Sequence, residues 1–410
     1  MQDWRWPTYR PRNITLEQVV YENDDPNRGG VRVKAKDGKV YLDAVGGIGC
    51  LPLGHSPKRW VAALTEQMNT LVSAAGPFWT DINTALARRI LDMAPVADGR
   101  IFFGNTGTEV TEASIKVALK ATGRDVIIGF DKAFHGRSLG SLSLTANPKY
   151  RDGFLTTPED DGKRFAHMNV VRAPFGDLEA TAKLLEQYAG RVAMVCLEPV
   201  QGEGGINPGK RDFLVGLHGL CRQHGALLGL DEIQAGSGRT GDFSAWTTLV
   251  GDDPALYPDI IWWAKALGGG FPISAIVARG DIAAHMVPGT HGSTFGGNPL
   301  ACRAAMETLD IMQDDDLFTR AGNQLATLQK IAEDKPISAV REVRGSGAML
   351  GMDFGDPELV SKLVAATAEQ GLLVTASGGI AIRWLFPYWA GEDILAEAWD
   401  KLGKAVAAVG

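Results

Sequence analysis

A lysine stands just after an apolar stretch of the sequence and just before a cluster of glycines. Lys265 follows Ile260–Trp263, and Gly268–Gly270 come soon after it. Most lysines are solvated, but a lysine that is withdrawn from water loses its proton more readily and can act as an amine nucleophile. Taken alone, the stretch favours a solvated lysine in a loop, so a chemical role depends on the groups that accompany it.

An acidic residue closes a second apolar stretch. Asp231 comes directly after Ala226–Leu230 and opens the sequence Asp-Glu-Ile-Gln at residues 231–234. We expect a strand here, and ligands gather at the carboxyl ends of strands in open α/β sheets. An acid in that place can orient a base, bind a metal or hold a cationic nitrogen, and Asp231 alone does not choose among these roles.

Two further stretches offer groups that bind anions. In residues 103–109 a strand runs into small residues and then a helix, whose free N–H groups form an anion site that the hydroxyls of Thr106 and Thr108 can extend. The alternative is an ordinary capped helix with one of these threonines as the cap. His291–Pro299 also precedes a predicted helix, and it fits either a second anion contact or a glycine-rich domain junction.

The combination of an anion cradle, a strand-end acid and a strand-end lysine narrows the chemistry. Pyridoxal phosphate needs all three, because its phosphate must be anchored, an acid keeps its pyridine nitrogen protonated, and a lysine forms an imine with it and later moves a proton. We therefore expect a pyridoxal-phosphate enzyme that moves an amino group, with Lys265 and Asp231 as its catalytic residues.

Strands and helices alternate along the middle of the chain, which is typical of a mostly parallel sheet covered by helices on both faces. The expected strands are Arg100–Phe103, Val126–Phe130, Val192–Leu197, Ala226–Leu230, Ile260–Trp263 and Ser274–Ala278, and the helices are Glu109–Ala121 and Phe213–His224. Before them we expect irregular structure over the first 30 residues, a hairpin over 31–42 that turns at Asp37-Gly38, and helices over 57–71 and 83–93.

From about residue 297 the pattern changes to α+β, with expected helices over 298–313, 317–333 and 357–370 and a short sheet over 340–354. We therefore expect an α/β fold with a large, mostly parallel sheet domain and a smaller α+β C-terminal domain. Residues 1–45 are expected to form an N-terminal segment that packs with the small domain, 46–290 the large cofactor-binding domain, and 291–410 the small domain.

The composition excludes several classes of protein. The chain has 410 residues, is 45% hydrophobic and carries a net charge of −7, so it is expected to fold and gives no electrostatic reason to bind nucleic acid. No apolar stretch reaches the roughly 20 residues of a membrane span, and no apolar signal core begins the chain, so a cytoplasmic protein is expected. The four cysteines have no metal-ligand spacing, so we expect buried reduced thiols and no metal.

The chain resembles the class III pyridoxal-phosphate aminotransferases, the acetylornithine, ornithine and 4-aminobutyrate group, which have the type I fold. The resemblance covers nearly the whole chain and is strongest in the spacing between residues 231–234 and Lys265. It implies that Lys265 forms the Schiff base, that Asp231 pairs with the pyridine nitrogen, and that Gln234 contacts the ring hydroxyl. It also implies that Phe134 stacks on the ring.

The resemblance also assigns the phosphate contacts. Gly107 and Thr108 would hold the phosphate within one subunit, and Thr294 would reach the phosphate of the neighbouring subunit. The active unit implied by these contacts is a homodimer with its active sites at the subunit interface.

Substrate contacts follow from the same resemblance. Arg383 matches the arginine that binds the substrate α-carboxylate, and Glu203 resembles the acid that pairs with that arginine when an ω-amine donor is bound. Arg137 matches the arginine that holds the distal carboxylate of glutamate, and two guanidinium groups suit a dicarboxylate. The alternative for Arg137 is a structural ion pair.

Two departures from the family pattern bear on the choice of donor. The segment Leu385–Trp389, after Arg383, is rich in bulky aromatic residues, and Phe78 and Trp79 stand near the expected substrate entrance. We expect these side chains together to reshape the donor pocket. Ile48 falls where ornithine-type enzymes have a tyrosine for the donor α-carboxylate, so free ornithine is less favoured than an acetylornithine-like donor.

The expected reaction is a ping-pong transamination from an ω-amine donor to 2-oxoglutarate through Lys265. One alternative is an aminomutase of the same fold, and another is a 4-aminobutyrate, diamine or other amine transaminase with a reshaped pocket. A non-catalytic relative is disfavoured by the complete set of Asp231, Gln234 and Lys265, and a nicotinamide dehydrogenase by the lack of a GxGxxG after an early strand.

Overall fold

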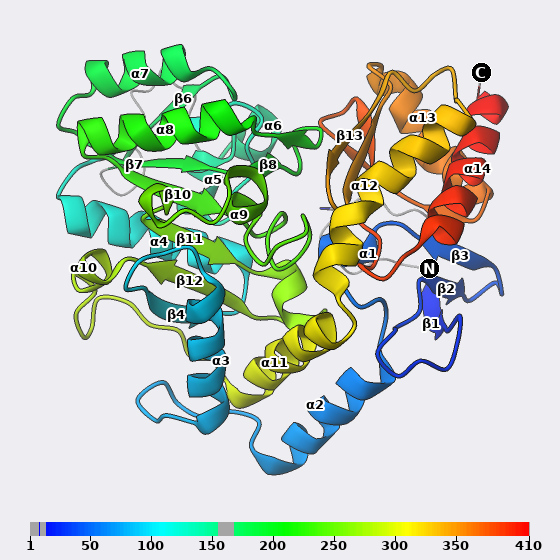
Figure 1. The fold of residues 1–410 in the computed structure, drawn as a ribbon, viewed down its shortest axis with the longest axis horizontal. Coiled ribbons are helices and arrows are strands. Elements are labelled where there is room, and N and C mark those ends of the chain that lie inside the picture. Colours follow the sequence, from blue (N-terminus) through cyan, green and yellow to red (C-terminus); the bar gives the residue numbers. More distant parts are fainter. Residues whose placement is uncertain (1–7, 9–13, 155–167, 410) are drawn as a thin grey trace.

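A seven-stranded sheet forms the centre of the larger lobe, in a computed structural model that describes residue 8 and residues 14–154 and 168–409. Its strand order is β4-β12-β11-β10-β7-β5-β6. In that order the strands are Arg100–Gly104, Ser274–Ala278, Ile260–Trp263, Leu227–Asp231, Val192–Leu197, Val126–Phe130 and Asn169–Ala173. β12 is antiparallel to β11 and β4, and the remaining pairs in this sheet are parallel, which confirms the predicted mostly parallel sheet (Figure 1).

Helices cover this sheet on both faces because its central strands are apolar on both sides. Consecutive residues of a strand point to opposite faces. Ile127 belongs to the core cluster that contains Val117 of α4 (Gly107–Thr122), whereas Ile128 belongs to the cluster that contains Phe213 of α8 (Arg211–His224). The predicted strands and both predicted helices are confirmed here. The pattern does not predict β6, a half-buried edge strand of mixed polarity, or α7 (Leu178–Gln187).

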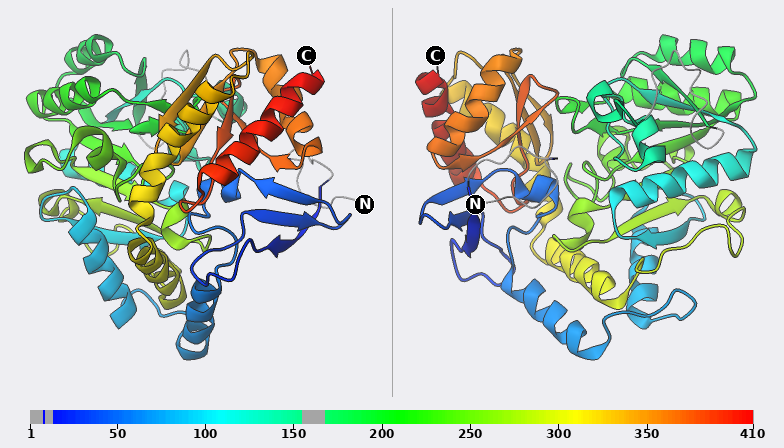
Figure 2. Two further views of the ribbon diagram at one scale, coloured as in Figure 1. Left: turned by 45° about the vertical axis from the view of Figure 1, so that its right-hand side comes forward. Right: turned by 180° about the vertical axis from the view of Figure 1, so that it is seen from behind.

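A second sheet, of order β13-β14-β17-β16, forms near the C-terminus. Its strands are Glu342–Ser346, Met349–Asp353, Ala381–Trp384 and Thr375–Ser377, and it packs with α12 (Leu317–Asp334) and α13 (Pro357–Glu369). The helix α14 (Glu392–Val409) lies against α12 and α13 (Figure 2). Among the described residues, no helix is both long enough and apolar enough to cross a membrane.

The N-terminal strands lie beside C-terminal elements. β1 (Leu16–Val20), β2 (Arg32–Ala35) and β3 (Val40–Asp43) form one sheet with β15 (Leu372–Leu373), and β3 is parallel to β15 (Figure 2). The β2–β3 hairpin was expected, but β1 shows that the expectation of irregular structure over the first 30 residues is wrong for residues 16–20. Residues 1–7 and 9–13 of that stretch lie outside the described residues. β1 is largely exposed and so has no apolar signal.

The division into residues 1–45, 46–290 and 291–410 stays a prediction. One helix after residue 290, α11 (Pro299–Asp314), packs against α2 (Lys58–Thr70) and α3 (Asp81–Met93) of the preceding part of the chain. This contact crosses the predicted boundary at residue 290.

The aromatic segment after Arg383 lies in the core rather than at a ligand pocket. Phe386 and Tyr388 are fully buried, and Trp389 is 4% exposed. None of the three lines the cavity described below. The expectation that they reshape the donor pocket therefore stays a prediction, and any such effect would have to act from behind the residues that line the cavity.

Arg239 ties this aromatic segment to two other loops. Its fully buried guanidinium donates to the carbonyl oxygens of Gly49 (3.2 Å), Ala348 (3.2 Å) and Phe386 (2.7 Å), and it lies 4.6 Å from the ring centre of Tyr388. We expect Arg239→Met to lower the free energy of unfolding by about 2–4 kcal/mol, because buried carbonyls lose their donor. Denaturant titration measures this loss.

The control for that measurement is an exposed arginine. Arg191 pairs with Asp125 at the surface, where an ion pair contributes about 0–1 kcal/mol. We expect Arg191→Met to change stability much less than Arg239→Met. Equal losses in the two variants would contradict the bridging role of Arg239.

Candidate active site

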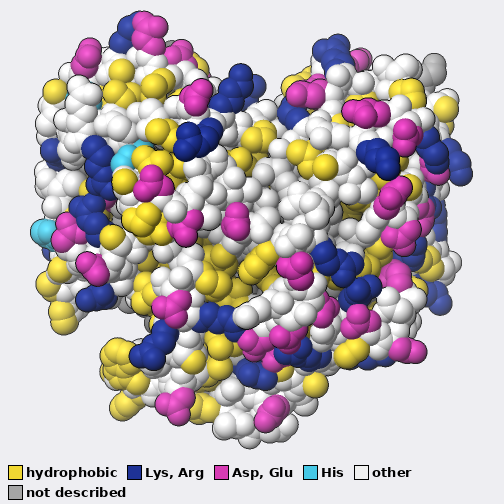
Figure 3. Space-filling view, viewed as in Figure 1, with side chains coloured by type: hydrophobic (Ala, Val, Ile, Leu, Met, Phe, Trp, Pro, Cys, Tyr) yellow, Lys and Arg dark blue, Asp and Glu magenta, His cyan; other side chains and the backbone are white. Residues whose placement is uncertain are grey.

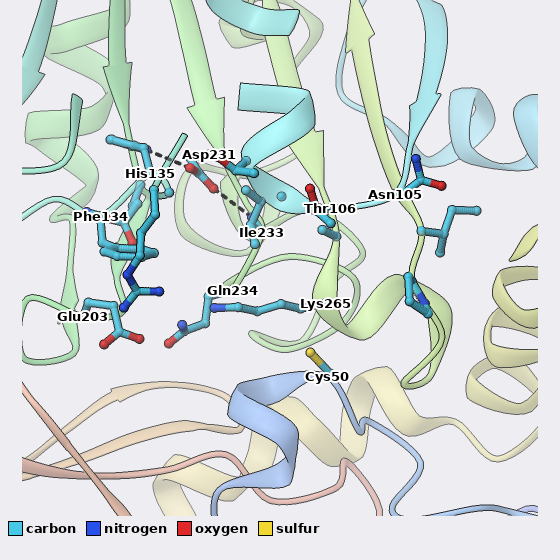
Figure 4. A pocket seen from close by; sticks show the side chains of 18 of the residues that line it. Cys50, Asn105, Thr106, Phe134, His135, Glu203, Asp231, Ile233, Gln234 and Lys265 are labelled. Atoms are coloured by element: carbon cyan, nitrogen blue, oxygen red, sulfur yellow. Dashed lines mark hydrogen bonds and ion pairs between the residues drawn. The ribbon is translucent and has the colours of Figure 1, made fainter. Parts of the chain in front are cut away.

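A cavity of about 440 Å³ opens at the carboxyl ends of β4, β10 and β11, beside the short helix α1 (Gly46–Gly49) (Figure 4). This is the edge where ligands gather in open α/β sheets. The predicted site residues that line it are Gly107, Thr108, Phe134, Arg137, Glu203, Asp231, Gln234 and Lys265. The structure therefore brings together residues from Gly107 to Lys265, which are 158 positions apart in sequence (265 − 107).

Lys265 begins the turn that follows β11 and reaches across the cavity toward Gln234 (Figure 4). Its φ of 43° lies in the left-handed region, where a side chain is strained, and such strain persists mainly at functional sites that the surrounding structure holds. Burial lowers the pKa of the Lys265 ammonium, and nearby Glu203 opposes this shift while Arg383 adds to it. The lowered pKa favours the neutral amine that nucleophilic chemistry needs.

Asp231, the last residue of β10, forms a buried pair with His135. Its Oδ2 lies 2.7 Å from His135 Nδ1, and its Oδ1 accepts a hydrogen bond from the Ile233 N–H (3.0 Å). Burial alone would lower the pKa of His135, but the neighbouring Cys196 and the hydrogen bond to Asp231 raise it well above its usual value. The raised pKa of His135 favours a cationic imidazole next to Asp231, whose carboxylate borders the cavity.

The helix α4 presents its first turn to the cavity. Thr106 is the cap, since its Oγ1 accepts from the Glu109 N–H (3.4 Å), so the capped-helix alternative holds. Gly107 and Thr108 follow it in the first turn, where backbone N–H groups have no acceptor within the helix. The anion cradle stays a prediction that is compatible with this cap, because a capped helix still offers these groups to an anion at the cavity wall.

Close packing explains the glycine at the start of this helix. A Cβ on Gly107 would lie 2.7 Å from Cδ1 of Ile233, which also lines the cavity. Opposite, Phe134 presents an aromatic ring to the same space (Figure 4). A flat ring with an attached phosphate fits between an apolar side chain, an aromatic ring and a row of backbone donors, so the donor set fits pyridoxal phosphate.

A second charged pair stands on the substrate side. Arg383, in β17, donates to Glu203 Oε1 (2.5 Å), to the Gly202 carbonyl oxygen (3.2 Å) and to Gln234 Oε1 (3.0 Å). Burial would raise the pKa of Glu203, but Arg383 and Lys265 together lower it. Glu203 lines the cavity and Arg383 is not among the described lining residues, so the carboxylate stands between the arginine and the cavity.

Arg137 is exposed at the cavity and stacks on aromatic rings. Its guanidinium carbon lies 5.1 Å from the ring centre of Phe134 and 4.9 Å from that of Tyr150. Within the described part of the chain, no carboxylate pairs with Arg137. The alternative of a structural ion pair therefore finds no support among those residues.

Besides Arg383, three of the predicted residues do not line the cavity. Thr294 and Trp79 are exposed, Trp79 by 85%, and Ile48 is 42% exposed in a left-handed conformation. Their predicted roles stay predictions. Cys50 borders the cavity beside Lys265, so the expectation of a buried thiol is wrong for this cysteine (Figure 4).

The other three cysteines are buried and unpaired, as expected: Cys196, Cys221 and Cys302. Nowhere in residues 14–154 and 168–409 do three or more His, Cys, Asp or Glu side chains gather as metal ligands would.

Sequence reasoning misses His135, Glu198 and Ile233, which also line the cavity. His135 directly follows Phe134, but its partner Asp231 lies far away in sequence, so no local pattern marks it. Glu198 follows the buried strand β7 in the way that Asp231 follows the apolar run of β10, and that position could have identified it. Burial raises the pKa of Glu198 to about 7, with His135 opposing and Asp231 adding to this shift.

A strand-end lysine, a buried acid and an anion cradle at one edge of a mostly parallel sheet are together the features of an aminotransferase. The family model described as aminotransferase class-III matches residues 21–406, and the chain belongs to this family, which uses pyridoxal phosphate. The chain is similar to the acetylornithine aminotransferase of Methanopyrus kandleri, with 38% identity over 385 residues that cover 93% of each chain.

Solved structures agree in fold. The ornithine aminotransferase of Toxoplasma gondii superposes with a TM-score of 0.86 at 28% identity, covering 99% of this chain and 92% of that one. An (S)-enantioselective omega-transaminase from Thermomicrobium roseum reaches a TM-score of 0.85 at 25% identity, covering 97% and 93%. The predicted class III aminotransferase and its type I α/β fold are therefore confirmed.

Proposed function

We propose that this enzyme takes the amino group of an ω-amine donor resembling acetylornithine and transfers it to 2-oxoglutarate by ping-pong transamination. The closed pair of Arg383 and Glu203 near Lys265 carries the proposal. An ω-amine donor has no carboxylate on its reacting carbon, so it reaches Lys265 while the pair stays closed. 2-Oxoglutarate does carry a carboxylate next to its reacting carbon. This carboxylate replaces Glu203 as the partner of Arg383, since a guanidinium can bind a carboxylate through two hydrogen bonds.

Arg137 provides the second anchor for the acceptor. It is exposed at the cavity and held over Phe134, so its guanidinium is oriented without being neutralised by a described carboxylate. A five-carbon dicarboxylate suits two arginines, because each arginine binds one carboxylate.

The lining residues are those that would hold pyridoxal phosphate. The first-turn amides at Gly107 and Thr108 would bind its phosphate, Asp231 would pair with its ring nitrogen, and Gln234 would reach its ring hydroxyl. Phe134 would lie against one face of the ring. When bound, the cofactor supplies the carbon that carries the amino group and a ring that accepts an electron pair.

Lys265 moves the proton in this proposal. Its lowered pKa leaves a neutral amine that accepts a proton from the reacting carbon and later returns it. The Asp231 carboxylate, held by His135, would pair with the ring nitrogen of the cofactor, and Arg383 would bind the acceptor carboxylate so that the neighbouring keto carbon is within reach of Lys265.

Relatives support a donor of the acetylornithine kind. The Methanopyrus kandleri relative is named an acetylornithine aminotransferase, and the similar Toxoplasma gondii structure an ornithine aminotransferase. Ile48 replaces the tyrosine that ornithine-type enzymes use, which disfavours free ornithine. The similarity to an omega-transaminase keeps a simple amine donor as the second candidate.

The active unit in this proposal is a homodimer. Five large apolar side chains are exposed in this region: Leu71, Val72, Phe78, Trp79 and Phe295. The first four lie in the connection between α2 and α3, which projects from the molecule with apolar side chains around it (Figure 3). A contiguous apolar surface of this kind fits a subunit contact. Exposed Thr294 adjoins Phe295 there and would reach the partner's phosphate site.

A donor screen with 2-oxoglutarate tests this function by following glutamate formation. Acetylornithine, ornithine, 4-aminobutyrate, putrescine and lysine are the donors, and acetylornithine is expected to give the highest kcat/KM. Omission of 2-oxoglutarate is the control, since an aminomutase would turn over without it. Protein that binds pyridoxal phosphate but forms no glutamate from any of the five donors would refute the proposal.

A further inference from the structure

Glu198 lies between the cofactor side of the cavity, which carries Phe134, and the substrate side, which carries Glu203. It comes directly after β7, lines the cavity and is 6% exposed. One carboxylate oxygen accepts from the Phe134 N–H (2.9 Å) and the other from the Gly202 N–H (3.1 Å). The Glu198 side chain therefore binds two backbone segments. One segment carries the Phe134 ring on the cofactor side of the cavity, and the other contains Gly202 and continues into Glu203.

The turn that carries Glu203 is held from its other side by Ser377, in β16. Ser377 Oγ donates to the Gly202 carbonyl oxygen (2.7 Å) and accepts from the Gly205 N–H (2.9 Å). Gly202 itself has no room for a side chain, because a Cβ there would overlap Gln234 Oε1. Hydrogen bonds to the backbone on both sides of the turn therefore set the position of Glu203. Ser377 makes those on one side, and the Glu198 carboxylate makes the one on the cavity side.

We propose that Glu198 is a positioning residue that fixes Phe134 and the Glu203 turn relative to each other, and so links cofactor affinity to the choice between an ω-amine donor and an α-carboxylate acceptor. The second half of this statement rests on the proposed function. The Glu198 carboxylate holds the backbone from which Glu203 reaches Arg383, through the Gly202 N–H, so releasing Gly202 changes how readily the Glu203–Arg383 pair opens for the acceptor.

The isosteric variant Glu198→Gln tests this role. Its amide keeps one acceptor but presents an NH₂ group to the other backbone N–H, so one of the two segments is released. We expect the dissociation constant of pyridoxal phosphate, titrated into apo-protein, to rise about tenfold, the effect of losing a hydrogen bond to a charged group. We also expect the ratio of kcat/KM for the ω-amine donor to that for 2-oxoglutarate to change by about tenfold or more.

Two further variants separate positioning from general stability. Glu232→Gln is the matched control, because Glu232 is also a buried strand-end carboxylate but does not itself line the cavity, and it accepts from the N–H groups of Ala245 and Trp246 at the start of α9 (Ala245–Val250). It is expected to lower the melting temperature at least as much as Glu198→Gln, with both functional readouts within about twofold of wild type. Glu198→Asp keeps both charged acceptors and is expected to restore part of the loss.

The outcomes are distinct. Wild-type cofactor affinity and an unchanged donor-to-acceptor ratio in Glu198→Gln would overturn the proposal, as would equal changes in Glu232→Gln. If wild-type protein uses no ω-amine donor, the proposed function fails, and the cofactor titration alone then decides whether Glu198 positions Phe134.

Discussion

Replacing Lys265 with alanine is expected to lower the rate of transamination by roughly 10⁴-fold or more, because one side chain provides both the nucleophile and the proton carrier. The strained backbone at Lys265 and the burial that lowers its pKa both favour a reactive amine rather than a surface charge. Steady-state assays with the best donor and 2-oxoglutarate measure the loss.

Lys265→Arg is the matched control for charge and size. Arginine keeps a cation in the cavity but cannot supply a neutral amine, since its pKa exceeds 12. We expect it to be as inactive as Lys265→Ala while keeping the fold, measured by circular dichroism and thermal unfolding. Activity within tenfold of wild type in either variant would contradict the assigned role.

The second large effect is expected for Asp231→Asn, which should lower kcat by roughly 10²–10³-fold. Asparagine keeps the volume of the side chain, but the negative charge beside the cofactor ring is lost. The His135 imidazole also loses its charged partner, which held it 2.7 Å away. Rapid-mixing measurements of the donor half-reaction alone isolate this step from the binding of the acceptor.

Stability provides an independent readout of the same pair. Burial opposes the charged form of His135, but Cys196 and Asp231 raise its folded pKa well above that of the unfolded chain. A raised pKa contributes stability below the unfolded pKa of about 6.5, and this contribution is lost as the pH rises through the folded value. The stability gap between wild type and Asp231→Asn should therefore be larger at pH 6 than at pH 9, and a gap that widens toward pH 9 would contradict the ion pair.

The cofactor side of the site could be predicted from sequence because its residues sit at the ends of apolar strands. Asp231 and Lys265 are marked by Leu227–Asp231 and Ile260–Trp263, and the parallel sheet then brings the two strand ends together. His135 was not predicted, because its role depends on a contact with the distant Asp231 that no local pattern records. Glu198 was missed although it directly follows the buried strand β7, a position that could have identified it.

The substrate side was harder to predict, for a different reason. The aromatic residues at 386–389 turn into the core around Arg239, and Trp79 points outward, although both were expected near the donor pocket. Residue type predicts burial or exposure on average, but it does not show whether a buried aromatic side chain of a loop packs in the core or lines a ligand cavity. In the fold, the exposed strand β1 escaped prediction for the related reason that it has no apolar face.

The most direct test of the central claim is to locate the covalent attachment of the cofactor. Protein is incubated with pyridoxal phosphate, treated with borohydride to make the attachment permanent, digested, and mapped by mass spectrometry. The site described above predicts one modified lysine at stoichiometric yield, Lys265, within the peptide that contains the glycines at 268–270. Stoichiometric modification of another lysine, or none at Lys265 in protein that transaminates, would contradict it.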